Sequence, residues 1–423
     1  MRNNPSGLTY LYGSNQHRHH TFRIAVEMKE AVDGAALRKA ADTSIRRYPY
    51  FSIELVLTED DVLHKVVPNS RPLVIVDGVM PVLLNSEESN RHLLSLAYAG
   101  NTVYFDMSHS LTDGTGAMEF VKTTLYYYVC EQYGKTFPAD HIRTLDTPIT
   151  EEELTDPYLN FSGLTEKPLG GFPGTSPAFT PEDYGVSLTK SETLFRMSVD
   201  EKAFMKYSRE NDGSPATMTA AFLAKALYRL RGDSDDSDKP VRIAMPYNNR
   251  LALNTPLAHH SLVESCAVTY PAKARDWSIE KLGTAARGTV ALQSDPSNMR
   301  AMIYAKVMLL EKLRAAADLE TVKAICAESG KRGLNVVSSV VSYVGKIPLG
   351  APEDFIESMY SCVQGFSGWI IEMNAVGGKF CYAVCQAFSE DIFVKALADE
   401  MRREGIEVEL GGAEPLIYPK IKT

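Results

Sequence analysis

The chain has 423 residues, of which 44% are hydrophobic and 23% charged, and this balance excludes a wholly disordered, collagen-like or coiled-coil protein. Its net charge of −9 disfavours nucleic acid and anionic membrane surfaces as main partners. No stretch reaches the roughly 18–20 uncharged apolar residues of a membrane span, and no N-terminal signal is apparent. Six scattered cysteines without a CxxC pair are typical of free thiols. We therefore expect a cytoplasmic protein without a membrane span.

The first half of the chain alternates between strand and helix patterns. Apolar residues at every second position of 22–28 predict a half-buried strand. Asp33 stands where a helix N-cap belongs, before an apolar stripe over 37–45. A strand hairpin is expected over 51–67. A further strand over 103–107 runs directly into a polar turn, and the apolar stripe beyond that turn predicts a helix.

A change of composition divides the chain. Residues 157–185 contain five prolines and five glycines, which is typical of a linker. We therefore predict an N-terminal lobe over 1–165, a linker over 166–188 and a C-terminal lobe over 189–423.

The second half repeats the mixture of strands and helices, and this order, with its hairpins, predicts an α+β fold in layers. The expected strands cover 194–199, 241–246, 262–270, 336–344, 368–374, 379–388 and 406–410. The expected helices begin at the caps Asp200, Ser214 and Ser389 or cover 278–292, 298–316 and 319–329.

The sharpest local signal is the turn that follows the strand over 103–107. It has the form HxxxDG, with His109, Asp113 and Gly114. Among nine histidines only His109 has Asp four residues later, and average residue usage gives about 0.03 chance matches to the whole motif. A histidine at a strand end can take a proton from an attacking hydroxyl or amine. Gly114 would let the backbone turn tightly as the helix begins.

A structural interpretation of the same turn stays open. In it, Asp113 is only the N-cap of the following helix, and His109 is a partly buried neighbour.

The turn and its surroundings resemble the chloramphenicol acetyltransferase-like superfamily, which includes alcohol acyltransferases, polyketide-associated and plant acyltransferases, and the condensation domains of nonribosomal peptide synthetases. The stretch 32–37 and the Arg-Tyr-Pro turn at 47–49 are similar to the first strand, helix and turn of these families. Ser342 to Gly345 is similar to their SxxG element. The resemblance covers nearly the whole chain and is closest to stand-alone bacterial alcohol acetyltransferase-like proteins.

The resemblance implies two lobes, each a mixed β-sheet with flanking helices, and an active-site tunnel between them. It implies acyl transfer from acyl-CoA, as a co-substrate, to a small-molecule hydroxyl or amine acceptor. His109 would be the general base, without an acyl-enzyme. Ser342 would donate to the oxyanion, with Ser338 and Ser339 as further candidates, although a buried strand whose serines bond to backbone stays open.

Asp113 would then be structural and paired to an arginine, with Arg250 and Arg23 as the two candidates. No permanently bound cofactor and no metal site is expected, and the residues that bind the co-substrate are not assigned.

Two departures from the family pattern leave other functions open. Condensation domains carry a second histidine where Ser108 stands, and residues 365–369 match the DFGWG motif of plant members only superficially. The alternatives are a non-catalytic homologue and a condensation-like enzyme that takes its acyl group from a carrier protein.

Overall fold

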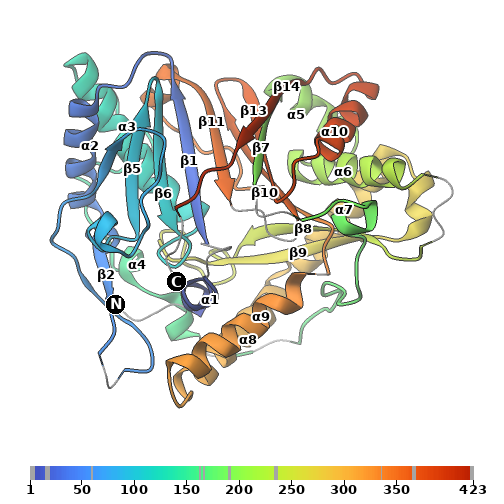
Figure 1. Cartoon of the computed structure of the whole chain (residues 1–423), viewed down its shortest axis with the longest axis horizontal. Coiled ribbons are helices and arrows are strands. Elements are labelled where there is room, and N and C mark those ends of the chain that lie inside the picture. Colours follow the sequence, from blue (N-terminus) through green and yellow to red (C-terminus); the bar gives the residue numbers. More distant parts are fainter. Residues whose placement is uncertain are drawn as a thin grey trace.

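The structure is a computed structural model of the chain, drawn in Figure 1. Its two large β-sheets lie side by side, with helices on their outer sides, and β2 and β3 form a third sheet of two strands (Figure 1). The structure describes residues 5–14, 20–58, 61–161, 163–164, 167–188, 192–232, 237–334, 336–363 and 368–419.

The first sheet is mixed and is covered on one face by α2 and α3, whose apolar sides pack on its strands. Its strands follow the order β11-β1-β6-β5-β4, and all neighbours are antiparallel except β4 and β5. Its elements are β1 (Thr21–Met28), α2 (Gly34–Arg47), β4 (Ile75–Asp77), β5 (Leu94–Ala99), β6 (Thr102–Ser108), α3 (Gly114–Tyr133) and β11 (Ile356–Val363).

The second sheet is also mixed, since β10 is parallel to both of its neighbours in the order β14-β7-β13-β12-β10-β8-β9. Helices α5, α6, α7 and α10 pack against one face and form the larger apolar core. Its elements are β7 (Thr193–Asp200), α5 (Glu201–Glu210), α6 (Pro215–Arg231), β8 (Val241–Asn248), β9 (Val263–Tyr270), α7 (Ile279–Gln293), β10 (Ser339–Tyr343), β12 (Trp369–Val376), β13 (Lys379–Gln386), α10 (Ile392–Arg403) and β14 (Glu409–Pro415).

The remaining elements lie beside the sheets. A small apolar core joins α1 to α8 and α9 through Leu8 and Tyr12, and Figure 1 shows α1 next to this pair, close to the end of β6. These elements are α1 (Pro5–Gly13), the hairpin β2 (Ile53–Val56) and β3 (Lys65–Pro68), α4 (Glu151–Leu154), α8 (Pro296–Arg314) and α9 (Leu319–Leu334). Short 3₁₀ helices are η1 (Pro49–Phe51), η2 (Glu87–Ser89), η3 (Pro157–Asn160), η4 (Pro181–Tyr184), η5 (Ala272–Asp276) and η6 (Ala351–Phe355).

The two halves of the chain exchange one element. Strand β11 comes from the second half, yet it pairs with β1 at the edge of the first sheet. Its other edge faces β12, where Ser361 contacts Asn374. The first sheet is therefore completed by the second half, and the boundaries 1–165, 166–188 and 189–423 stay a prediction.

Most of the elements predicted from local sequence patterns are present in the structure. Asp33 caps α2 by accepting from the backbone of residues 35 and 36, as expected. The last helix was wrongly assigned to a Ser389 cap, because it begins at Ile392 after Asp391. The predicted strand over 406–410 is displaced to β14. The sequence patterns did not identify α1, β4, β5 or β11.

Within the described residues, no helix combines the length and the apolar composition that crossing a membrane requires.

Candidate active site

The predicted HxxxDG turn lies where β6 ends and α3 begins. The backbone N–H of His109 donates to the carbonyl of His20 at 2.9 Å, which extends the pairing of β6 with β1 by one residue. The hydroxyls of Ser108 and Ser110 lie 2.7 Å apart within the turn. The end of an inner strand on one side and a helix on the other therefore hold the turn. Ser108, where condensation domains have a histidine, bonds within the turn.

Two aromatic rings contact the imidazole of His109. The ring of Phe22, on β1, lies 4.6 Å from it, and the ring of Tyr10, on α1, stacks on it at 4.8 Å. The side chain stays half-buried, and its Nδ1 is enclosed without a well-formed hydrogen bond among the described residues. Desolvation lowers the pKa of His109 to about 4, although the charge of Asp113 and the backbone of Thr112 act in the opposite direction. The imidazole is therefore neutral at physiological pH.

Asp113 is buried, and its carboxylate accepts four hydrogen bonds. Arg250 makes a bidentate pair with it at 2.8 and 2.9 Å. The backbone N–H groups of Gly116 and Leu262 each donate at 2.9 Å. Asp113 therefore caps α3 and at the same time binds the second half of the chain.

Of the two arginines considered for this role, Arg250 is the partner of Asp113. Arg23 instead pairs with Asp106, which lies opposite it in the register of β1 and β6. Arg23 is therefore paired within the first sheet, and Asp113 is not its partner.

A second set of contacts fixes the segment 258–262 against the turn. Arg250 donates to the carbonyls of Ala258 and His260, and Thr112 donates to the carbonyl of His259 at 2.7 Å. A side chain at Gly116 would overlap that same carbonyl, so glycine is required there by close approach of the two backbones.

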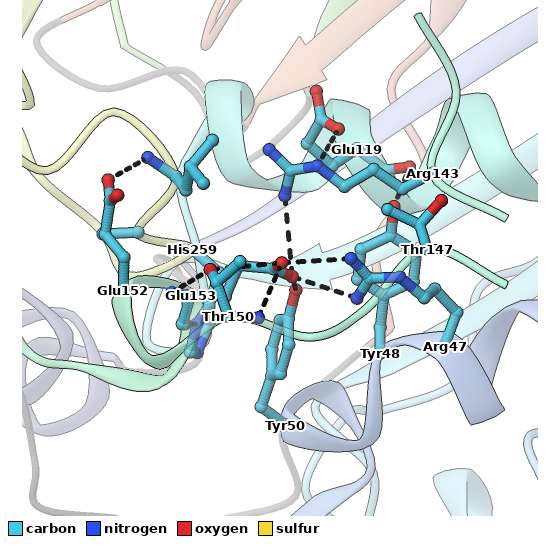
Figure 2. A network of polar contacts seen from close by, with 12 residues as sticks. Arg47, Tyr48, Tyr50, Glu119, Arg143, Thr147, Thr150, Glu152, Glu153 and His259 are labelled. Atoms are coloured by element: carbon cyan, nitrogen blue, oxygen red, sulfur yellow. Dashed lines mark hydrogen bonds and ion pairs between the residues drawn. The ribbon is translucent and has the colours of Figure 1, made fainter. Parts of the chain in front are cut away.

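A buried ionic network supports this segment from the other side (Figure 2). The carboxylate of Glu153 accepts from both terminal nitrogens of Arg47 at 3.0 Å and from the hydroxyl of Tyr50 at 2.6 Å. The imidazole of His259 lies 2.6 Å from the carbonyl of Glu153. The end of α2, the short helix α4 and the segment 258–262 are thus connected into one unit next to the turn.

Replacing Tyr50 by phenylalanine is expected to lower the free energy of unfolding by ~1.5–3 kcal/mol, as is typical for loss of a hydrogen bond to a charged group. The ring fits unchanged, so the loss reports the bond to Glu153 alone. Thermal unfolding of the variant measures the effect, with Tyr304→Phe, at an exposed tyrosine, as the matched control. Equal melting temperatures for Tyr50→Phe and the wild type would contradict the role of this bond.

Gly114 is the first residue of α3 and has no left-handed backbone, so the expected reason for this glycine is wrong. A Cβ there would come within 3.0 Å of the side chain of Val344, which follows β10. The missing side chain therefore allows the end of β10 to approach the start of α3, which brings the SxxG element beside the HxxxDG turn.

The three serines near β10 differ in their surroundings. Ser338 and Ser339 are buried and hydrogen-bond backbone groups of Arg242 and Trp369. Ser342 stays half-buried, and it lies in register with Glu372 of β12. Only Ser342 of this set retains an accessible side chain, and its role as an oxyanion donor stays a prediction.

A cavity of about 200 Å³ lies between the two sheets, beneath the C-terminal segment. It contains the ion pair of Arg23 and Asp106 together with Arg196. His109 is not among its lining residues, so the tunnel expected beside His109 stays a prediction. The cavity is lined by Thr21, Arg23, Ala25, Val79, Pro81, Val82, Tyr104, Asp106, Leu194, Arg196, Cys362, Glu414, Pro415, Leu416, Ile417, Tyr418 and Pro419.

The site brings together one neutral imidazole, a turn held by a buried ion pair and a half-buried serine on a neighbouring strand. Sequence patterns missed Tyr10, which covers the imidazole from an unpredicted helix, and Glu372, whose carboxyl interrupts an apolar strand. Residues 365–367 of the weak DFGWG match lie outside the described residues. No three His, Cys, Asp or Glu side chains in the described part of the chain gather as a metal ion would require.

Comparison with known proteins finds similarity at the level of structure. No family model and no curated sequence matches the chain. F. graminearum TRI101 complexed with coenzyme A and T-2 mycotoxin superposes with a TM-score of 0.62 at 12% identity, covering 97% of this chain and 99% of that chain. Polyketide synthase associated protein 5 from Mycobacterium tuberculosis has a TM-score of 0.60 at 14% identity, covering 94% and 96%. The first condensation domain of the CDA synthetase has a TM-score of 0.59 at 12% identity, covering 95% and 94%.

These matches span almost the entire chain on both sides, so the similarity concerns both lobes and their arrangement. The predicted α+β fold of chloramphenicol acetyltransferase-like type, with a mixed sheet and flanking helices in each lobe, is confirmed.

Proposed function

We propose that this protein is an acyltransferase that moves an acyl group from a CoA thioester to a hydroxyl or amine acceptor. The observation that carries the proposal is the half-buried, neutral imidazole of His109, held on a rigid turn where the two lobes meet. Two structures of similar fold, of F. graminearum TRI101, were crystallised with coenzyme A or ethyl coenzyme A, which supports a CoA thioester as the donor.

In the proposed reaction, the imidazole of His109 accepts the proton of the acceptor as its oxygen or nitrogen attacks the thioester carbonyl. The carbonyl oxygen becomes an oxyanion, for which Ser342 is the proposed donor. The carbon–sulfur bond then breaks, and the imidazolium returns its proton to the departing thiolate. The products are an ester or amide and free CoA, and no acyl-enzyme is formed.

The ion pair of Asp113 and Arg250 takes no part in proton transfer in this scheme. It holds the turn, and therefore the imidazole, in one position relative to the second half of the chain. Positioning of this kind is a large part of catalysis, because a small displacement of the base lengthens its hydrogen bond to the acceptor.

The test is release of free thiol from a panel of acyl-CoA thioesters, with alcohols and amines as acceptors. We expect release that depends on both substrates, together with the acylated acceptor in the product mixture. Binding of CoA thioesters without turnover for any acceptor would instead support a non-catalytic homologue.

A carrier-bound acyl group is the second candidate donor, favoured by the structural match to a condensation domain. A phosphopantetheinylated carrier protein loaded with the same acyl group distinguishes the two. Turnover with the loaded carrier protein and none with acyl-CoA would show that the donor is a carrier-bound acyl group and not acyl-CoA.

The pH dependence of kcat/KM is expected to follow the lowered pKa of His109. Because this pKa is about 4, the base stays unprotonated from pH 8 down to about 5. With a neutral alcohol as acceptor, kcat/KM should stay flat over this range and fall as the pH drops through about 4. Intrinsic fluorescence at each pH shows where the protein stays folded. Half-loss of kcat/KM in folded protein near the ordinary histidine pKa of about 6.5 would contradict the environment described for His109.

A further inference from the structure

The side chain of Glu372 is unusual for its place in the fold. It lies in the middle of β12, whose other residues are mostly buried and apolar. Its neighbours Ile371 and Met373 point into the larger core, so Glu372 points to the opposite face of the sheet, toward the first lobe. Unlike the residues on either side, Glu372 keeps part of its surface accessible. Glu372 is therefore not fully enclosed by the residues around it.

A first chain of contacts connects Glu372 to the HxxxDG turn through β10. Glu372 is in register with Ser342, and Val344, two residues further along the chain, approaches Gly114 at the start of α3. One strand spacing and two residue steps give a backbone separation of about 8 Å between Glu372 and Val344. Glu372 and His109 therefore belong to the same region.

A second chain of contacts leads to the same region through β1 and β11. The ring of Phe22 lies against the imidazole of His109. Ser361 is one diagonal step from Phe22 on the same face of this strand pair, and it contacts Asn374 of β12. Glu372 lies two residues before Asn374 and therefore on the same face of β12. Two independent paths thus place Glu372 and His109 in the same region, where the two sheets meet.

Among the residues that the structure describes, the carboxyl group of Glu372 has a polar neighbour but no cation. The hydroxyl of Ser342, in register with Glu372, lowers the pKa of this carboxyl group, and no charged side chain among the described residues shifts it. Desolvation is the larger effect and raises the pKa of Glu372 to about 7. A desolvated carboxylate without a counter-charge is costly, and a bound cation would remove that cost.

We propose that Glu372 binds a positively charged ammonium group of the acceptor, at a distance from the atom that receives the acyl group at His109. The acceptor class is therefore an amino alcohol or a polyamine rather than a neutral alcohol. This inference rests on the proposed acyltransferase function and narrows its acceptor. Glu372 is a specificity residue in this arrangement, because it contacts the substrate away from the reacting atoms.

The test compares acceptors that differ only in charge. The probes are 5-aminopentan-1-ol and pentane-1,5-diol, each with its shorter and longer homologues, and acetyl-CoA is the donor. The wild type should prefer the amino alcohol of the best length. In Glu372→Gln, kcat/KM for that amino alcohol should fall about 10- to 100-fold through a higher KM, because a charge-assisted bond is lost. The value for the diol should stay within about threefold of the wild type. The exposed Glu357→Gln on β11 is the matched control.

Equal losses for the amino alcohols and the diols, or no change for either, would overturn the assignment. Isothermal titration of the wild type and Glu372→Gln with the amino alcohols measures binding without turnover. Weaker binding to the variant supports the site even if no thiol is released, in which case the proposed reaction fails and the ammonium site stands. Equal binding to both proteins overturns the site even if acyl transfer is active.

Discussion

Replacing His109 by alanine is expected to lower kcat/KM for acyl transfer by ~10²–10⁴, the usual contribution of a positioned general base. The imidazole lies on a turn held by backbone bonds on one side and by the ion pair of Asp113 with Arg250 on the other. The alanine variant removes the group that accepts the proton and leaves that support in place. Thiol release at saturating acyl-CoA measures the effect.

Two measurements separate loss of the base from loss of the fold. The melting temperature of His109→Ala should stay close to that of the wild type, because its ring is half-buried, its aromatic contacts within the described residues are Tyr10 and Phe22, and its Nδ1 makes no well-formed bond among those residues. Binding of CoA should also persist. The exposed His141, replaced by asparagine, is the control for loss of a histidine elsewhere. A His109→Ala protein that is folded and keeps its rate would show that another group is the base.

Local sequence patterns were sufficient to predict β1 and the strand and helix on either side of the HxxxDG turn. Alternation over 22–28 and the Asp33 cap predicted β1 and the start of α2, because side-chain periodicity and capping depend on neighbouring residues only. The HxxxDG turn was placed correctly between β6 and α3 for the same reason. Strand β11 was missed, and its place in the first sheet depends on pairing across more than three hundred residues, which no local pattern reports.

Local sequence patterns also could not predict which residues pair within the site. Asp113 and Arg250 are 137 residues apart, and Arg23 was an equal candidate until the register of β1 and β6 assigned it to Asp106. Glu372 carried a signal in the sequence, since it is a charged residue within an apolar strand. Its proposed role depends on the contacts of β10 with α3 and of β12 with β11, which only the tertiary structure provides.

Removing the carboxylate of Asp113 is expected to destabilise the protein strongly. Asp113→Ala leaves the buried guanidinium of Arg250 with neutral acceptors, which are the backbone carbonyls of residues 258 and 260 and the side-chain oxygen of Asn248. Breaking a buried pair in this way costs ~3–5 kcal/mol, because an uncompensated charge stays in the interior. For a chain of this length the loss corresponds to a fall of ~3–6 °C in melting temperature. Activity should fall as well, because the turn that carries His109 loses its anchor.

A double variant shows whether the unpaired charge of Arg250 causes the loss of stability. In Asp113→Ala combined with Arg250→Met, no buried charge remains, so the melting temperature should lie above that of Asp113→Ala alone. The exposed pair of Lys39 with Glu131 is the control, and Glu131→Gln should change the melting temperature by less than about 1 °C, since surface pairs contribute little. If the losses of Asp113→Ala and Arg250→Met simply add, the two side chains do not act as a pair. A double variant that regains stability without activity would show that the ion pair aligns His109 in addition to holding the lobes together.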